Sequence, residues 1–497
     1  MKLILIRCAE RANNKSNIPW HYGFYKDILE PLGHSVDILD NILYNHSTSE
    51  LVDIIIKNGY EMVGIGGFGS AYRYIKELTI ELKKANNKII IVVGGQITAD
   101  YEFLIRACPI DVIVNGEGEI TLKKVIKCIE ESGDLNSVPG IVFLQDDNIV
   151  KTGDEKLIKL DDLPALNINH FDLEKYDSEV PKHFLINDRT RQLQREGHKY
   201  IFILTARGCA YNCFFCFRQL KGWRRYSKDT IERLFKYLKE NKYSFLSIFD
   251  EWLNNEDHIN NICELAKKYE IYWDGQGRVD EVTEEKMRYI KESNCYRFTF
   301  GIESFDATML KNMKKMVKPE QNINALNICY KVGIHSLPPL IIGTPGENRK
   351  TIYNTRAGLW RCYLIPDRIA VAILNPYPGT AAYKYGLEKG YITDKEALHL
   401  ELGRKNKLTI NFSQLSNLEL ITWQHWLYFE AAINFRIKHK RLAINKKFYW
   451  KFCDFFRPYR ALLKNEPLHF ILFNLYLFLG IFFWFKPCKK IEQDDPK

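Results

Sequence analysis

The sequence lacks an N-terminal apolar run long enough for a secretory signal peptide, and residues 1–7 instead predict a first β-strand. Its 12 cysteines are scattered outside one short loop, so no disulfide framework is expected. These absences predict a reducing, cytoplasmic compartment. No glycine-rich loop ends in Lys-Ser or Lys-Thr, and no G-x-G-x-x-G opens the first predicted helix, which excludes two phosphate-binding motifs.

The composition is that of an ordinary globular protein, with 46% hydrophobic and 27% charged residues. A chain of 497 residues has room for two or three domains. The net charge of +10 is uneven, because residues 431–490 hold 13 Lys and Arg against two acids, a balance of +11. The remainder carries about −1 by subtraction (10 − 11), so the basicity belongs to the C-terminal tail.

The first 150 residues alternate strand patterns with amphipathic helical patterns. Strands are predicted at residues 2–7, 35–39, 62–66, 88–93 and 111–114, and helices at 25–32, 49–58, 71–85, 101–107 and 120–131. This alternation predicts an α/β fold with a doubly wound, Rossmann- or flavodoxin-like parallel sheet over residues 1–150. Within it, residues 140–153 predict a small hairpin, and residues 151–195 predict a linker to the next domain.

Glycine-rich loops follow three of the predicted strands, at residues 66–70, 94–98 and 116–119. Ligands of doubly wound sheets bind at the carboxyl ends of the strands. Glycine lets a backbone approach a flat ligand closely and take positive φ angles. The candidate binding residues are Gly67, Ser70, Gly94, Gly95, Gln96, Gly116, Glu117 and Gly118.

Three cysteines lie close together after the apolar run at residues 200–204: Cys209, Cys213 and Cys216, with the spacing C-x3-C-x2-C. Three thiolates can hold three corners of a four-iron cluster and leave one iron open to an outside ligand. A tetrahedral zinc site needs a fourth ligand nearby, and Cys263 is 47 residues further on. The other interpretation is three buried or redox-idle thiols.

This spacing, with the aromatic Phe215 before the third cysteine, resembles that of radical S-adenosylmethionine (SAM) enzymes. Five further segments follow in the family's order, and the resemblance covers about residues 1–395. It implies a partial (β/α) barrel over residues 196–395, with SAM bound near Asp250 and Glu251, Arg278, Glu303 and Ser304, and Gly343. The Asp250–Glu251 segment would hold the SAM amine through its backbone, Arg278 would meet a carboxylate, and Glu303 and Ser304 would meet the ribose. Two solvated acids after a strand are the alternative for the first pair.

The glycine loops and their order resemble the cobalamin-binding domain that precedes the barrel in one large radical SAM class. A histidine often follows the Gly-Gly pair by two positions, but here that position is Ile97, and no D-x-H-x-x-G run exists. The resemblance therefore implies cobalamin bound without a histidine on cobalt, or a domain that has lost it. A ligand-free platform is the third interpretation.

The resemblance implies reductive cleavage of SAM to a 5′-deoxyadenosyl radical, followed by cobalamin-dependent methylation of an unactivated carbon, or sometimes of phosphorus. The alternatives are ring closure or oxidation by the same architecture, and a cobalamin sensor without catalysis. A methylthiotransferase is disfavoured, since no second three-cysteine set precedes the barrel. Expected partners are a small-molecule or natural-product substrate and an electron donor such as flavodoxin or ferredoxin. No catalytic residue is assigned.

Residues 396–497 predict a helical C-terminal region, rich in aromatic residues and basic charge. Residues 468–485 form an apolar run broken only by His469, Asn474 and Gly480, at the short end for a membrane span. Peripheral contact with an anionic membrane, a single span and a cap over the substrate pocket all remain open. Nucleic acid is not expected, because the basic residues are interleaved with long apolar faces.

Overall fold

The computed structural model describes residues 1–8, 17–176, 179–218, 222–253, 255–364, 369–402 and 408–438. The chain divides into two compact units, Met1–Phe435 and Arg436–Lys497. The fold and the site described below belong to the first unit. The apolar run at 468–485 and nearly all of the basic, aromatic tail lie outside the described residues.

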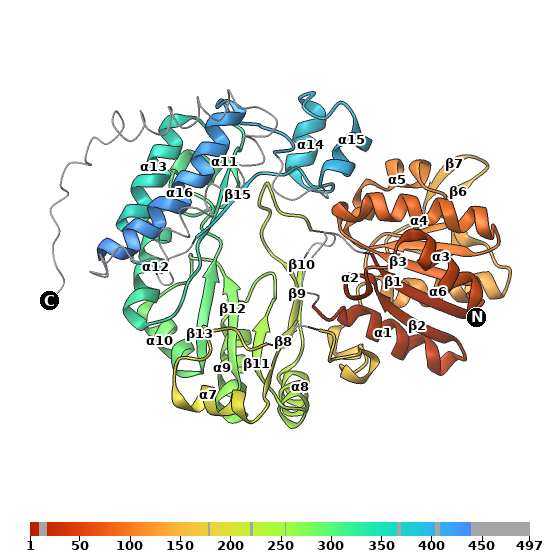
Figure 1. Cartoon of the computed structure of the whole chain (residues 1–497), viewed down its shortest axis with the longest axis horizontal. Coiled ribbons are helices and arrows are strands. Elements are labelled where there is room, and N and C mark those ends of the chain that lie inside the picture. Colours follow the sequence, from red (N-terminus) through yellow and green to blue (C-terminus); the bar gives the residue numbers. More distant parts are fainter. Residues whose placement is uncertain are drawn as a thin grey trace. The chain divides into compact units, whose positions relative to one another are not determined.

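A seven-stranded sheet forms the first domain, with the strand order β2-β1-β3-β4-β5-β6-β7 (Figure 1). The first five strands pair in parallel, and the last two add an antiparallel hairpin at one edge. The predicted doubly wound sheet is therefore confirmed, and the hairpin extends it. The strands are β1 (Lys2–Arg7), β2 (Ser35–Asp40), β3 (Met62–Gly66), β4 (Ile90–Gly94), β5 (Val112–Val114), β6 (Ile141–Gln145) and β7 (Asn148–Lys151).

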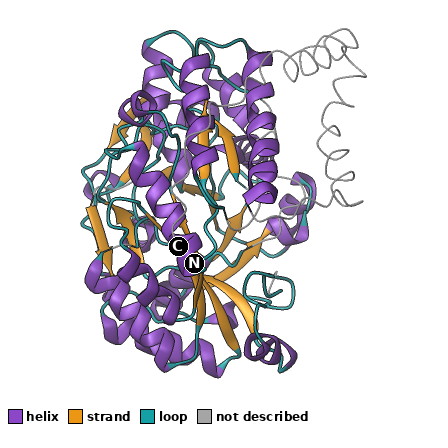
Figure 2. Cartoon of the chain, turned by 90° about the vertical axis from the view of Figure 1, so that its left-hand side faces the viewer, coloured by secondary structure: helices purple, strands orange, loops and turns teal. Residues whose placement is uncertain are grey.

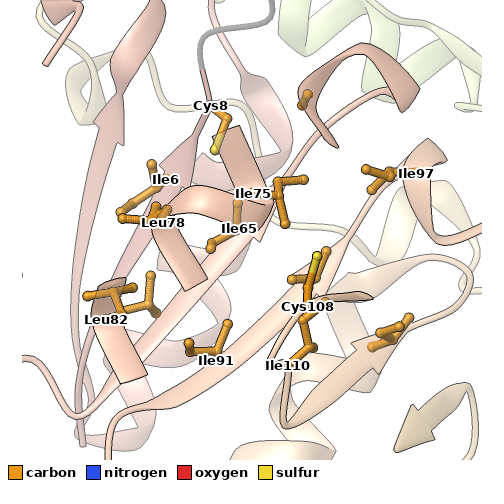
Figure 3. Close-up of a cluster of buried hydrophobic side chains, with 14 of the residues drawn as sticks. Ile6, Cys8, Ile65, Ile75, Leu78, Leu82, Ile91, Ile97, Cys108 and Ile110 are labelled. Atoms are coloured by element: carbon orange, nitrogen blue, oxygen red, sulfur yellow. The ribbon is translucent and has the colours of Figure 1, made fainter. Parts of the chain in front are cut away.

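Hydrophobic side chains of the helices and strands fill the space between this sheet and its helices. Figure 2 shows the helices and strands of the chain from a second side. One core cluster contains residues of α3 and α4, and a second contains residues of α1 and α6. Ile97 belongs to the first cluster and is fully buried among apolar side chains (Figure 3). The helices are α1 (Trp20–Leu29), α2 (Asn41–Tyr44), α3 (Thr48–Lys57), α4 (Tyr72–Ala85), α5 (Tyr101–Ala107) and α6 (Gly118–Glu130).

Six parallel strands form the second domain as an incomplete barrel. Four of them pair in the order β13-β12-β11-β8, and β14 pairs with β15. Two isolated parallel bridges, Arg297 with His335 and Glu303 with Leu340, connect the two groups. These strands are β8 (Lys199–Ile203), β11 (Tyr243–Ile248), β12 (Tyr272–Gly277), β13 (Cys295–Phe300), β14 (Pro339–Ile342) and β15 (Ala370–Ile373).

The strand β11 is buried at all six positions, as expected for a parallel strand covered on both faces. Side-chain caps fix where several barrel helices begin: Ser227 caps α8, Asn255 caps α9 and Thr283 caps α10. The helices are α7 (Asp188–Arg195), α8 (Lys228–Glu240), α9 (Glu256–Lys268), α10 (Glu284–Glu292), α11 (Ala307–Asn312), α12 (Pro319–Val332), α13 (Arg349–Arg361), α14 (Ala381–Glu388), α15 (Lys395–Leu402) and α16 (Asn417–Lys438).

Among the helices of the described residues, none combines the length and the apolar character needed to cross a membrane.

Candidate active site

The three clustered cysteines lie on and beside a two-stranded antiparallel hairpin. It consists of β9 (Ala206–Cys209) and β10 (Gly222–Arg225), which directly follow the first barrel strand. Cys209 is the last residue of β9, and Cys213 and Cys216 lie in the connection to β10. The backbone therefore brings the three thiols to one loop at the end of a barrel strand, where such folds place their chemistry.

The three thiols are free and influence one another. Burial raises the pKa of Cys209, and the neighbouring Cys213 adds to the rise. Loss of water around the Cys216 thiol raises its pKa to about 12, with further contributions from Cys213, Glu303 and Cys209. Within the described part of the chain, no three His, Cys, Asp or Glu converge to hold a single ion. A cluster has no such requirement, because each thiolate binds a different iron.

Asp250 is fully buried, and its hydrogen bonds stabilise the segment that leads into the cysteine loop. Its carboxylate accepts hydrogen bonds from the Thr205 amide at 2.7 Å, the Thr205 hydroxyl at 2.6 Å and the Ala206 amide at 3.0 Å. His258 Nε2 lies 3.3 Å from the same carboxylate, and the Asp250 carbonyl oxygen accepts from Gln276. The alternative of a solvated acid is wrong for Asp250. Its side chain fixes the entry to the cysteine loop and is not open to a cofactor.

Replacing Asp250 with alanine should lower the free energy of unfolding by about 3 kcal/mol or more, because two buried amides lose their acceptor. Denaturant unfolding of the purified protein measures the loss. The control is Asp257→Asn on α9, whose carboxylate is 82% exposed. Equal unfolding midpoints for the Asp250→Ala variant and the unmodified protein would contradict this role.

Glu251, the next residue, is exposed and lines a large cavity. Partial loss of water there raises the pKa of its carboxyl group, while Arg218 acts in the other direction. Arg218 also lines the cavity, and its guanidinium donates to the Cys209 carbonyl at 2.8 Å. The cysteine loop therefore borders this cavity through Arg218 and Phe217.

Arg278 was expected to meet a ligand carboxylate, but in the structure it is 6% exposed and binds protein groups. Its Nε lies 3.1 Å from Asp280, and its Nη2 donates to the Lys315 carbonyl at 2.5 Å. Its guanidinium also stacks on the Tyr211 ring at 3.6 Å. In the structure Arg278 holds the Lys315 segment against the loop of Tyr211, and its contact with a ligand carboxylate stays a prediction.

Glu303 and Lys315 form a buried ion pair, with 3.1 Å between Nζ and Oε1. Glu303 has a φ of +61°, and Lys315 Nζ lies 6.0 Å from the centre of the Phe215 ring, beside Cys216. Ser304 is 1% exposed and bonds to Thr355 at 2.8 Å, which opposes its expected contact with a ribose. Sequence analysis did not select Lys315, because nothing distinguishes it from the neighbouring lysines of residues 311–318.

Gly343 begins a turn with φ +82°, a conformation that favours glycine. The buried Glu347 carboxylate accepts from the amides of Gly343 and Thr344. Burial raises the pKa of Glu347 to about 7, and these two amides oppose the rise. Glu347 thus stabilises the turn from within.

The cavity has a volume of about 1280 Å³ and is bordered by both domains. Loops after β3, β4 and β5 of the first domain line it, together with the cysteine hairpin of the second. Of the residues predicted from the sequence, those in its wall are Gly67, Gly94, Gly95, Gln96, Gly116, Glu117, Gly118 and Glu251. Ser70 is 7% exposed and does not line the cavity, so the structure gives it no contact there.

Gly94 and Gly95 differ in what a side chain would meet. A Cβ on Gly94 would find no heavy atom within 4 Å, so this position leaves an open cradle in the cavity wall. Gly95 has a φ of +87°, and a Cβ there would lie 2.8 Å from the Gly67 carbonyl oxygen. The fold itself therefore requires glycine at position 95.

Ion pairs connect the third glycine loop to the cysteine hairpin. Arg207 lies 2.8 Å from Glu119 and 3.3 Å from Glu117, and Arg224 also bonds to Glu117. Arg207 and Arg224 are opposite one another in the β9–β10 pair. The second oxygen of Glu117 is buried without a hydrogen-bond partner. Glu117 therefore connects the third glycine loop to the cysteine hairpin, a role that the sequence did not reveal. Its second oxygen has no partner among the described residues and could accept from a ligand.

Two further segments in the cavity wall were missed from the sequence. The first two turns of α1 contribute Trp20, His21, Tyr22 and Tyr25, and the segment 161–169 contributes several further lining residues. The latter belong to the predicted linker, which therefore helps to form the site. Their types gave no signal, because aromatic and apolar residues in a connection are equally typical of ordinary packing.

Two family descriptions match this architecture. Residues 25–126 match the B12 binding domain, and residues 203–357 match the radical SAM superfamily. The chain is a radical SAM enzyme with a B12 binding domain. The second match begins at the end of β8 and includes the three cysteines, and the first covers all three glycine loops.

Relatives of this radical SAM enzyme carry different activities in their names. An uncharacterized methyltransferase of Pyrococcus horikoshii is 27% identical over 364 residues, which cover 71% of this chain and 75% of the relative. An anaerobic magnesium-protoporphyrin IX monomethyl ester cyclase of Synechocystis is 26% identical over 374 residues, covering 72% of this chain and 71% of the relative.

A solved structure of the cobalamin-dependent SAM radical enzyme OxsB, with aqua-cobalamin and SAM bound, has the same fold. The TM-score is 0.59 at 20% identity, and the match covers 84% of this chain and 58% of OxsB. This chain therefore spans less than two thirds of that protein.

The cofactors of this radical SAM enzyme are SAM, a four-iron cluster and cobalamin. The residues present fit these groups. Three free thiols on one loop suit a cluster with an open iron. For cobalamin, the open cradle at Gly94 and the unbonded Glu117 oxygen border a cavity large enough for a bulky ligand.

Proposed function

We propose that the enzyme transfers a methyl group from SAM, by way of cobalamin, to an unactivated carbon of a small-molecule substrate. One observation carries the proposal: the glycine loops of the B12 binding domain and the cysteine hairpin of the radical SAM domain border the same cavity. A methyl carrier and a radical source that share one chamber can act on one substrate without releasing intermediates to water.

When bound, SAM and the reduced cluster supply a 5′-deoxyadenosyl radical that removes hydrogen from a substrate carbon, and cobalamin supplies the methyl group. The protein's own contribution is position. Asp250 and the Glu303–Lys315 pair stabilise the chain around the cysteine loop. The ion pair of Arg207 with Glu119 connects the cysteine hairpin to the third glycine loop. These contacts hold the two cofactor regions at one separation.

Ring closure without methyl transfer is the second candidate, since one relative is named as a cyclase. An anaerobic incubation with SAM and a reductant distinguishes the two. Methyl transfer predicts both 5′-deoxyadenosine and S-adenosylhomocysteine, because one SAM supplies the radical and another the methyl group. Formation of 5′-deoxyadenosine alone, by protein that carries corrinoid, would favour the cyclase-like reaction.

The electron donor that we propose is a small acidic carrier such as flavodoxin or ferredoxin. Residues 311–318 lie against the cysteine loop, because the Phe214 amide donates to the Met313 carbonyl at 2.9 Å. Met316 in this segment is 82% exposed. The segment also presents exposed lysines that form no ion pair with a described carboxylate: Lys311, Lys314 and Lys318.

Changing these three lysines to glutamate should slow flavodoxin-driven SAM cleavage on the order of 10-fold or more at low salt, because like charges slow the encounter. Cleavage driven by dithionite should stay within about twofold. The matched control changes three exposed lysines of the first domain, Lys57, Lys88 and Lys123, to glutamate. Equal slowing by both triple variants would mean that net charge, not this surface, sets the rate.

The membrane contact predicted for the tail stays a prediction.

A further inference from the structure

His21 lies in the first turn of α1, at the cavity wall. This turn is packed onto two of the glycine loops. A Cβ on Gly66 would lie 2.6 Å from the Tyr22 hydroxyl, and a Cβ on Gly118 would lie 2.5 Å from the Tyr25 hydroxyl. The His21 ring is 4.3 Å from the Tyr22 ring and 6.1 Å from the Tyr25 ring. His21 therefore lies beside two tyrosines that contact the chain at the end of β3 and at the start of α6.

The imidazole of His21 is available to a ligand. Its side chain is exposed, and it lines the cavity. Neither ring nitrogen has a hydrogen bond or ion pair with any described residue. The contrast is with the buried His258 and His399, whose Nε2 atoms bond to Thr205 and Asp100. Histidines that serve packing alone usually bond through the ring in this way.

The imidazole is also in the right protonation state for a metal. The ring is open to the cavity but enclosed by its walls, and this partial loss of water lowers the pKa of His21 to about 3; the nearby Arg7 and Arg207 lower it further. A neutral imidazole keeps a lone pair, which a metal ion requires. The positive charges of the two arginines disfavour protonation of the His21 ring, and neither arginine occupies a ring nitrogen.

We propose that His21 supplies a nitrogen ligand to the cobalt of bound cobalamin. The inference rests on the cofactor assignment and goes beyond it, because a histidine-free cobalt was the expectation from the sequence. That expectation considered the position of Ile97, whose side chain points into the hydrophobic core (Figure 3). The chain reaches the same cavity with a histidine from another segment, the first turn of α1.

The test is electron paramagnetic resonance of the full-length protein reconstituted with cobalamin and reduced to the Co(II) state. A nitrogen ligand splits the cobalt signal, and growth with ¹⁵N-labelled histidine should convert a triplet into a doublet. The nitrogen of cobalamin's own benzimidazole does not carry this label. A signal without nitrogen splitting, or one that the label leaves unchanged, would overturn the proposal.

Two variants sharpen the result. His21→Ala should lose the label-dependent splitting and still bind corrinoid. His46→Ala, at a half-buried position stacked on Tyr44 and outside the cavity wall, should keep both. Failure of the labelled wild-type protein to bind any corrinoid would overturn the cofactor assignment together with this proposal. Corrinoid bound without a histidine nitrogen would overturn this proposal alone and leave the proposed methyl transfer standing.

Discussion

Replacing Cys209, Cys213 and Cys216 together with alanine should remove the four-iron cluster and abolish all cleavage of SAM. The physical reason is that thiolates hold a cluster of this kind. Among the described residues, no other group of three or more His, Cys, Asp or Glu could replace these ligands. Iron content should fall from about four per chain to none, together with the brown absorbance. Anaerobic reconstitution, iron analysis and detection of 5′-deoxyadenosine measure the two effects.

The control for this variant removes three cysteines elsewhere: Cys108, Cys128 and Cys329 are buried and far from the loop in sequence. That control variant should keep the cluster, even if its free energy of unfolding is lower. Corrinoid binding should survive in the loop variant, because the glycine loops belong to the other domain. A full cluster in the loop variant would refute the assignment of these ligands.

Gly94→Val should weaken corrinoid binding on the order of 10- to 100-fold while leaving the cluster intact. The new side chain would project into open space in the cavity wall, so the fold tolerates it but the ligand meets it. Overpacking of a well-fitted contact costs about 1–3 kcal/mol, which corresponds to this range of affinity. Titration with cobalamin, followed by absorbance, measures the change.

The matched control is Gly153→Val, since a Cβ at that position also meets nothing within 4 Å and the residue does not line the cavity. Gly95→Val is unsuitable as a test, although Gly95 is also a candidate binding residue from the sequence. Its φ of +87° and the nearby Gly67 carbonyl mean that valine there would disturb the fold itself. Equal corrinoid affinity of the Gly94→Val variant and the unmodified protein would show that the ligand does not approach this loop.

Much of the fold could be predicted from the sequence, because its signals are local. The strand β1 and the strand β3 were predicted with their observed ends, since each is a short apolar run next to polar residues. The C-x3-C-x2-C spacing likewise places three ligands within one loop. Local patterns of this kind survive folding because the chain segment itself carries them.

The remainder of the site depends on contacts between distant segments, which no local pattern records. Arg207 meets Glu119 across 88 positions of sequence, and Arg224 meets Glu117 across 107. The backbone of the Asp250 segment was expected to meet a ligand, but no local pattern indicated that its carboxylate is buried and accepts from the amides of Thr205 and Ala206. His21 had no motif at all, and only the folded turn of α1 brings it to the cavity.

The central claim is that the cluster and the cobalamin act in one shared cavity, and magnetic interaction between them tests it most directly. The protein, loaded with both groups, is reduced so that the cluster and Co(II) each carry an unpaired electron. Pulsed electron paramagnetic resonance should then show dipolar coupling between the two spins, and this coupling should vanish in the variant that lacks the three cysteines. Spectra of the fully loaded protein that equal the simple sum of the two isolated signals would contradict a shared cavity.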